Sequence, residues 1–283
     1  MSEPLLVQYR TVGDWEKFDY HAHLEHYEIY FFHEGSCRYL IHNLIYDLQP
    51  GDILLMDGKT LHRPNIQPDK EYIRSVCHFS PQWIYGVLSE LKSLHLLEVF
   101  EKLHHCLIRT NENEESKELE RLFWQLTKVK NAMLMDKNRD ESEIKVLLIQ
   151  ILFLVNRLGQ NSTYKLSTKK IDKTVHAEKI AEYIQKNYQE SLSIDQISND
   201  LKISKSYISH VFKEITGFTV MEYLMGCRLT QAKFLLEMKK EMSVKDVSFE
   251  CGFESVSHFS RYFKSKIGVT AKEYRRSRES LNS

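Results

Sequence analysis

The sequence is poor in cysteine, and the few cysteines that it has form no recognisable pair. Its 283 residues include 5 cysteines, an odd number, and no Cys-x-x-Cys spacing occurs. This usage argues against a disulfide framework and against a zinc site built on cysteine. It fits the reducing environment of the cytoplasm.

A targeting segment and a long apolar run are also missing. The residues that follow Met1 lack the charged-then-apolar pattern of a secretory signal. The most apolar stretch, residues 146–158, is interrupted by Gln150 and Asn156 and is too short to span a bilayer. We therefore expect a cytoplasmic protein without a membrane partner.

Net charge is absent from the chain as a whole, but its two parts differ. Residues 1–160 carry 18 basic and 24 acidic side chains, a balance of −6, whereas residues 161–283 carry 21 and 15, a balance of +6. A chain of this length is expected to form two domains. The second, basic part is the one suited to phosphate groups, and the first should not bind DNA by itself.

The last third of the chain contains the same segment twice. At a constant offset of 51, residues 206–223 and 257–274 are identical at 8 of 18 positions. A duplication of this size indicates one structural module that is used twice.

The first copy has the pattern of a helix-turn-helix. Ser193 is placed to cap a short helix, and residues 202–203 form the turn. Ser204 then caps a longer helix, and Gly217 follows its end, where a left-handed residue is commonly needed.

The second copy repeats this plan. Ser243 and Ser255 are the expected caps, residues 251–253 the turn, and Gly268 the end of the longer helix. Between the copies, residues 219–239 contain no proline and predict one helix of about 20 residues, roughly 30 Å long. Such a strut can separate two recognition helices by about one DNA turn, roughly 34 Å.

The outward faces of the two longer helices carry hydrogen-bonding and cationic side chains, which suit phosphates and base edges in the major groove. The candidate DNA-binding residues are Lys205, Ser206, Tyr207, Ser209, His210, Lys213, Glu254, Ser257, His258, Arg261 and Lys264. Two solvated helical faces in a small bundle would be the plain alternative. Two copies with the same spacing favour DNA.

With these motifs in view, residues of about 173–278 resemble the DNA-binding domain of the AraC/XylS family of bacterial transcription regulators. The resemblance covers the first motif from Ile197 to Gly217, the linker helix around Arg228, and the second motif from Val247 to Arg275. The family more often has Ala where Ser248 stands, and Pro where Thr219 or Ala271 stands; these departures affect helix starts alone.

Strand chemistry dominates residues 18–80, which suggests a small barrel or jelly roll. The expected strands are 28–32, 36–41, 44–48, 53–56 and 72–79, with His33 to Gly35 as a hairpin turn between the first two. The predicted fold class is therefore α+β, an N-terminal β-barrel plus helices followed by an all-α domain with two helix-turn-helix motifs.

A histidine-containing pattern in this region resembles the cupin barrel, which is the usual effector domain in the AraC family. The candidate effector-binding residues are His21, His23, Glu28, Arg38, Tyr39 and His62, with Trp15 and Arg74 as further pocket candidates. In metal-binding cupins, His21, His23, Glu28 and His62 would be the ligands of a divalent cation. Pocket or structural roles are favoured, so no metal and no other cofactor is expected.

Side-chain chemistry and the family resemblance together limit the chemical class of the expected effector. An aromatic ring beside Arg and His side chains suits the binding of a sugar, and it would suit a small carboxylate nearly as well. The family's frequent link to carbohydrate use makes a sugar the favoured effector.

Three helices are expected after the barrel, at 84–108, 116–135 and 141–158. The third is apolar beyond one narrow stripe, and the family resemblance predicts a homodimer built on such helices. The expected organisation is an effector and dimerisation domain at 1–160, a polar linker at 161–172 and a DNA-binding domain at 173–283.

These observations predict a ligand-responsive regulator that binds specific double-stranded DNA and is not an enzyme. Its partners would be a promoter of a carbohydrate-uptake or catabolic operon and, for an activator, RNA polymerase. Two alternatives stay open: a metal-dependent cupin oxygenase or isomerase, and an architectural DNA-binding protein that needs no effector.

Overall fold

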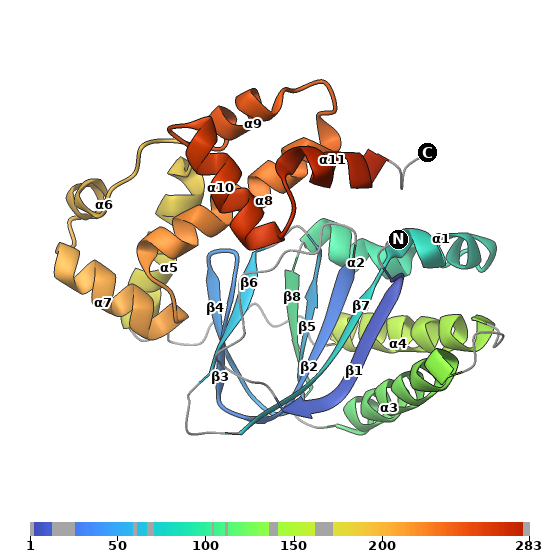
Figure 1. The fold of residues 1–283 in the computed structure, drawn as a ribbon. Helices are drawn as coiled ribbons and strands as arrows, with labels where there is room; N and C mark the ends of the chain where they lie inside the picture. Colours follow the sequence, from blue (N-terminus) through green and yellow to red (C-terminus); the bar gives the residue numbers. More distant parts are fainter. Residues whose placement is uncertain are drawn as a thin grey trace.

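The computed structural model describes residues 3–12, 26–58, 61–66, 71–103, 105–110, 113–135, 141–161 and 172–279. Strands and four helices form the N-terminal part of these residues, and the C-terminal part is entirely helical (Figure 1). This arrangement confirms the predicted α+β class.

Two antiparallel sheets make up the β part. One has the order β1-β7-β2-β5-β8 and the other the order β4-β3-β6. The strands are β1 (Leu5–Val12), β2 (Tyr27–Gly35), β3 (Cys37–Ile41), β4 (Leu44–Leu48), β5 (Asp52–Met56), β6 (His62–Ile66), β7 (Tyr72–Phe79) and β8 (His105–Arg109). Their inner faces share one core, in which Tyr30 and Tyr72 meet Tyr39 and Ile41. Among the described residues no ladder joins the sheets into a closed barrel, so the fold is like a jelly roll.

The hairpin predicted at His33–Gly35 is wrong. β2 continues through Gly35 and pairs with β5 and β7, whereas β3 pairs with β4 and β6 in the other sheet. Gly35 has φ +108°, and a Cβ there would lie 1.8 Å from the carbonyl oxygen of Glu71. The glycine therefore serves a crossing between sheets, where the backbone passes close to another segment.

The single helix predicted at 84–108 is also wrong. The chain forms α1 (Pro81–Glu90), then α2 (His95–Leu103), and then strand β8, which pairs with β5. Lys92, with φ +54°, follows α1 and is incompatible with a continuous helix. Arg109 fixes the new edge strand, because its guanidinium donates two hydrogen bonds of 3.0 and 2.9 Å to the buried carboxylate of Asp52.

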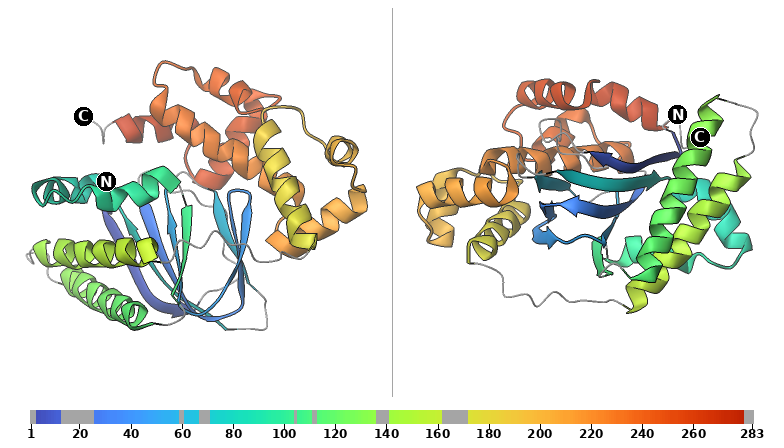
Figure 2. Two further views of the ribbon diagram at one scale, coloured as in Figure 1. Left: turned by 180° about the vertical axis from the view of Figure 1, so that it is seen from behind. Right: turned by 90° about the horizontal axis from the view of Figure 1, so that it is seen from below.

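The other two predicted helices are confirmed as α3 (Glu114–Met135) and α4 (Ser142–Asn161). They pack against each other and cover the outer face of the five-stranded sheet (Figure 2). Within the described ranges, no helix combines the length and apolar character needed to cross a membrane.

Seven helices follow in the described C-terminal part. They are α5 (Asp172–Asn187), α6 (Ile194–Leu201), α7 (Lys205–Thr216), α8 (Val220–Met238), α9 (Val244–Glu250), α10 (Val256–Ile267) and α11 (Ala271–Glu279). One core joins α5, α6, α7 and the start of α8, and another joins the end of α8 with α9, α10 and α11. The predicted strut is thus α8, which contributes to both helix-turn-helix units.

The outer face of the three-stranded sheet is docked on the first of these units. Leu40, Ile45 and Leu61 belong to the same core as α5 and α7. The Asn65 side-chain amide donates to the carbonyls of Glu214 and Ile215 at the end of α7, at 3.2 and 2.9 Å. The strands that line the space between the sheets are therefore in direct contact with the first helix-turn-helix.

Candidate nucleic-acid interface and effector pocket

The ends of α7 are set by the residues that the sequence predicts. The Ser204 side chain accepts a hydrogen bond from the Tyr207 amide, and Gly217 adopts φ +77° beyond the last turn. Ile208, Val211, Phe212 and Ile215 are buried along one side of the helix. The opposite side therefore faces solvent.

Five of the six α7 candidates are exposed, and one is not fully so. The exposed residues are Lys205, Ser206, Ser209, His210 and Lys213. Tyr207 is half-buried, and its hydroxyl is hydrogen-bonded to His176 Nδ1 at 3.0 Å. It can therefore position the helix against α5 as well as reach outward.

Acidic neighbours temper the positive charge of this face. Lys205 forms an ion pair with Asp195. Glu214 accepts from Lys173 Nζ at 2.8 Å and lies 3.3 Å from His210 Nε2. The hydrogen bond from Lys173 lowers the pKa of Glu214. The first face thus has fewer unbalanced cations than its lysines alone suggest.

The five candidates of the second unit are all exposed: Glu254, which lies just before the helix, and Ser257, His258, Arg261 and Lys264 on α10. Phe259 and Phe263 anchor the buried side, and Ser255 and Gly268 cap the two ends as predicted. Glu254 accepts a hydrogen bond from the Ser191 hydroxyl at 3.1 Å. Because Arg261 and Lys264 lie on an exposed face, this helix is the more cationic of the two.

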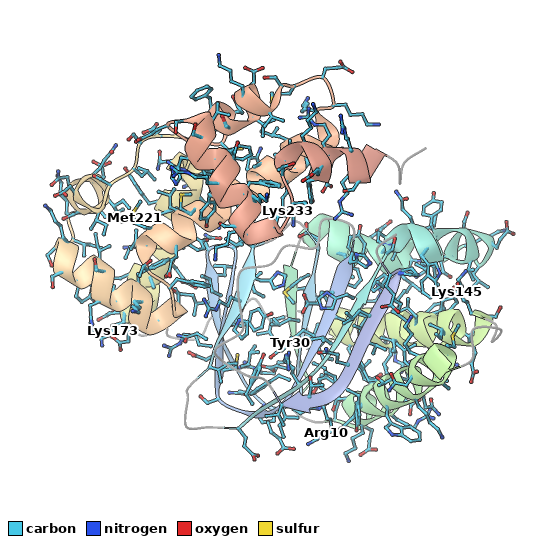
Figure 3. The ribbon with its side chains drawn as sticks, in the orientation of Figure 1. Arg10, Tyr30, Lys145, Lys173, Met221 and Lys233 are labelled. Atoms are coloured by element: carbon cyan, nitrogen blue, oxygen red, sulfur yellow. The ribbon has the colours of Figure 1, made fainter. Side chains whose placement is uncertain are left out.

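A cavity of about 180 Å³ lies between the two sheets. Strands β1, β2 and β7 of one sheet and β3 and β6 of the other contribute side chains to its walls, at alternate positions along β1, β2 and β7. The lining residues are Leu6, Gln8, Glu28, Tyr30, Tyr39, Pro64, Tyr72, Arg74, Val76 and His78. Tyr30 is marked in Figure 3 between the sheets.

Phenol groups dominate the polar chemistry of this cavity. The hydroxyls of Tyr30 and Tyr72 are 2.6 Å apart. Burial raises the pKa values of Tyr30, Tyr39 and Tyr72 well above the ordinary value, so these hydroxyls stay neutral and can both donate and accept. Arg74 Nη1 donates to Thr11 Oγ1 at 3.0 Å, which places a fixed positive charge at the wall.

An acid and two histidines form the other polar cluster. Glu28 is 3 % exposed, and its Oε2 lies 3.0 Å from His62 Nε2 and 3.8 Å from His78 Nδ1. Burial lowers the pKa of His78. Glu28 and His78 are paired in register on β2 and β7, and both line the cavity.

The structure brings some predicted effector residues together and separates others. Glu28 and Tyr39 line the cavity, and His62 contacts Glu28. Arg38 alternates with Tyr39 on β3 and pairs with Asp47 at 2.8 Å, so it does not line this cavity. His21, His23 and Trp15 lie outside the described residues.

Sequence reasoning missed several lining residues. Tyr72, Val76 and His78 share a face of β7 with Arg74 at a period of two, and Tyr30 follows Glu28 in the same way on β2. Side chains two apart on a strand share one face, so counting in steps of two from Glu28 and Arg74 could have identified these residues. Across the described ranges no group of three His, Cys, Asp or Glu residues is arranged to hold a metal ion.

Two family models match this chain. The model of the AraC-like ligand binding domain matches residues 5–151, just over half of the chain. The model of a helix-turn-helix domain matches residues 197–277.

Relatives that align over most of this chain are transcription regulators by name, in agreement with the family models. An uncharacterized HTH-type transcriptional regulator, YdiP of Escherichia coli, is 25% identical over 93% of this chain and 82% of its own. The Msm operon regulatory protein of Streptococcus mutans is 24% identical over 89% of this chain and 84% of its own. Among solved structures, ToxT of Vibrio cholerae aligns over 97% of both chains at 18% identity and a TM-score of 0.39. The chain belongs to the AraC/XylS family of DNA-binding transcription regulators, with a ligand-binding domain followed by a helix-turn-helix domain.

Proposed function

We propose that this protein is an effector-responsive regulator that reads promoter DNA through the exposed faces of α7 and α10. The observation that carries the proposal is the duplicated helix-turn-helix, in which ten of the eleven candidate side chains are exposed. The shared helix α8 has 19 residues, hence a length of about 28 Å. This spacing supports contact with successive major grooves.

The effector is proposed to enter the cavity between the sheets. Three neutral phenols, the Glu28 cluster and Arg74 offer alternating donors and acceptors, which suit the hydroxyls of a sugar. A small carboxylate is the alternative, since Arg74 could pair with it. The sugar and a carbohydrate-uptake or catabolic operon are preferred because of the family resemblance.

A homodimer is proposed on α3 and α4. Trp124, Val146 and Phe153 are large apolar side chains that are 46, 54 and 45 % exposed on these helices. Large exposed apolar side chains favour association. The proposed organisation is an effector and dimerisation unit at 1–160, a linker at 161–172 and a DNA-binding unit at 173–283, with RNA polymerase as a partner if the protein activates. A monomeric mass for the full chain at micromolar concentration in light scattering would overturn the dimer.

Simple measurements distinguish the proposed regulator from the two alternatives, a cupin enzyme and an architectural DNA-binding protein. A cupin enzyme requires a bound metal, so metal analysis with and without chelator distinguishes it. An architectural protein would bind DNA with the same affinity whatever small molecule is present. Neither alternative has a specific observation in its favour here, and the family matches support the regulator.

The test of the DNA proposal compares two residues on α10. Occupancy mapping of the tagged protein first identifies an operator. Arg261→Ala should then lower the discrimination between operator and scrambled DNA by ~1–3 kcal/mol if Arg261 reads a base. Lys264→Ala should weaken both DNAs alike and reduce the salt dependence of binding.

The matched control is Lys117→Ala, which removes the same charge from an exposed position on α3. It should leave both affinities close to those of the parent. If the footprints of Arg261→Ala and Lys264→Ala equal that of the control, α10 does not contact DNA and the proposal fails.

A further inference from the structure

The two helix-turn-helix units differ in net charge. Residues 172–217, which form α5, α6 and α7, carry 6 basic and 7 acidic side chains, a balance of −1. Residues 243–279, which include α9, α10 and α11, carry 8 and 5, a balance of +3. Because duplex DNA attracts cations whatever its sequence, the two units should hold it unequally.

Acidic side chains neutralise the cations of the first recognition helix. Asp195 on α6 forms an ion pair with Lys205, the first residue of α7. Glu214 on α7 accepts a hydrogen bond of 2.8 Å from Lys173, which is marked in Figure 3. The same carboxylate lies 3.3 Å from His210 Nε2. Each acid therefore offsets a positive charge that could otherwise bind a phosphate.

The carboxylate of Glu214 borders the candidate DNA face itself. Four of the candidate residues on α7 line one open hollow of about 500 Å³ together with Glu214: Ser206, Ser209, His210 and Lys213. A phosphate that approaches Lys213 would therefore also approach a negative charge, which repels it. Exposed ion pairs of this kind stabilise a fold little, so their main effect is on the charge that α7 presents to DNA.

The second recognition helix is not neutralised in this way. Among the described residues, neither Arg261 nor Lys264 forms an ion pair with an acid. Two hydrogen bonds from Thr270 lower the pKa of Glu273 at the start of α11. The nearby charges of Lys264 and Arg276 lower it further, so both cations lie close to this end of α11. Arg276 is exposed, and it extends the cationic surface of α10 onto α11.

We propose that the two units divide the binding of DNA between them. Lys264 and Arg276 bind phosphates, so the second unit holds duplex DNA of any sequence. Asp195 and Glu214 keep the first unit neutral, so α7 engages only where its base contacts fit. This division rests on the proposed function, in which both units face DNA, and it adds Arg276 on α11 as a phosphate contact.

The first test measures the affinity of the full-length protein for a scrambled duplex as a function of salt, by fluorescence anisotropy. Each phosphate contact contributes about −0.9 to the slope of log K against log salt. Lys264→Gln and Arg276→Gln should therefore each reduce the steepness of the slope by about 0.9. Lys205→Gln should leave it unchanged, because Asp195 already neutralises this lysine.

The decisive variant is the double substitution Asp195→Asn/Glu214→Gln, which frees Lys205 and Lys173. It should bind the scrambled duplex more tightly, by up to roughly eightfold at about 0.1 M salt for each freed cation that binds a phosphate. Poor folding cannot produce such an increase. In this background Lys205→Gln should reduce the slope, which it does not do in the parent. The matched control, Glu114→Gln/Glu118→Gln, removes two exposed, ion-paired carboxylates from α3 and should bind as the parent does.

Two results would overturn the division while the proposed function stands. One is an equal loss of slope in Lys205→Gln and Arg276→Gln. The other is an affinity of Asp195→Asn/Glu214→Gln for scrambled DNA equal to that of the α3 control. In both cases the parent would still prefer its operator to the scrambled duplex. A parent that binds neither duplex would overturn the proposed function itself, and the division with it.

Discussion

Asn65→Ala should loosen the contact between β6 and the C-terminal end of α7. The side chain belongs to the effector domain, yet it donates to two carbonyls at the C-terminal end of α7. These carbonyls lack partners within the helix, because the last turn of any helix leaves its acceptors unpaired. Alanine removes both hydrogen bonds and leaves the rest of the docked surface in place.

The expected magnitude follows from the two distances. The bond to Ile215 is 2.9 Å and partly buried, whereas the bond to Glu214 is 3.2 Å and exposed. A net value of about 0.5–1.5 kcal/mol for the partly buried bond, and about 0.5 kcal/mol for the exposed one, gives a loss of about 1–2 kcal/mol. This corresponds to a rise of roughly 5–30-fold in the opening equilibrium.

Hydrogen–deuterium exchange of the full chain measures this opening. Exchange should accelerate in the last turn of α7 and along β3 and β6, and should be unchanged in α10. The control is Asn187→Ala, which removes a hydrogen bond of 2.8 Å to the Tyr183 carbonyl inside α5 and leaves the docked surface intact. A rise confined to α5 in both variants, or an equal rise throughout α10, would refute the reasoning.

Two further predictions concern stability. Gly252→Ala should destabilise the protein more than Gly268→Ala. Both glycines have positive φ, which costs an alanine roughly 1–2 kcal/mol at either position. A Cβ at Gly252 would also lie 2.5 Å from the Tyr188 carbonyl oxygen, whereas a Cβ at Gly268 would have no atom within 4 Å. Equal urea midpoints for the two variants would contradict this. Burial lowers the pKa of His33 to about 4, whereas the unfolded chain keeps a value near 6.5. The unfolded state therefore binds the proton first as the pH is lowered. The free energy of unfolding should decrease as the pH is lowered from about 6.5 to about 4, by at most about 1.4 kcal/mol per pH unit. His33→Gln should flatten this slope in urea titrations across the window, and an unchanged slope would exclude His33 as its source.

The helical part could be predicted closely because its signals are local. Ser193, Ser204, Ser243 and Ser255 each cap the helix that follows them, as their positions before apolar periodic runs imply. Thr219 stands where the family prefers proline, and it forms a capping box with Glu222 at the start of α8. A helix start depends on a few neighbouring residues, which the sequence displays directly.

The β part was predicted less well because strand partners are distant in sequence. The hairpin expected at Gly35 was wrong, since β2 and β3 take their partners from different sheets. Strands β1, β6 and β8 were not predicted as strands at all, and β8 fell inside a predicted helix. Each depends on pairing with a segment far along the chain, which a short apolar run does not reveal.

The sequence by itself determined that this chain carries two helix-turn-helix units on a shared helix, because duplication, caps and periodicity are properties of neighbouring residues. Only the tertiary structure decided which side chains meet between the sheets. Tyr30, Tyr72 and His78 line the cavity together with Glu28, whereas Arg38 pairs with Asp47 outside it. It also decided that Asn65 and Arg63 reach the helical part, since a contact between residues about 150 positions apart depends on the packed surfaces of both.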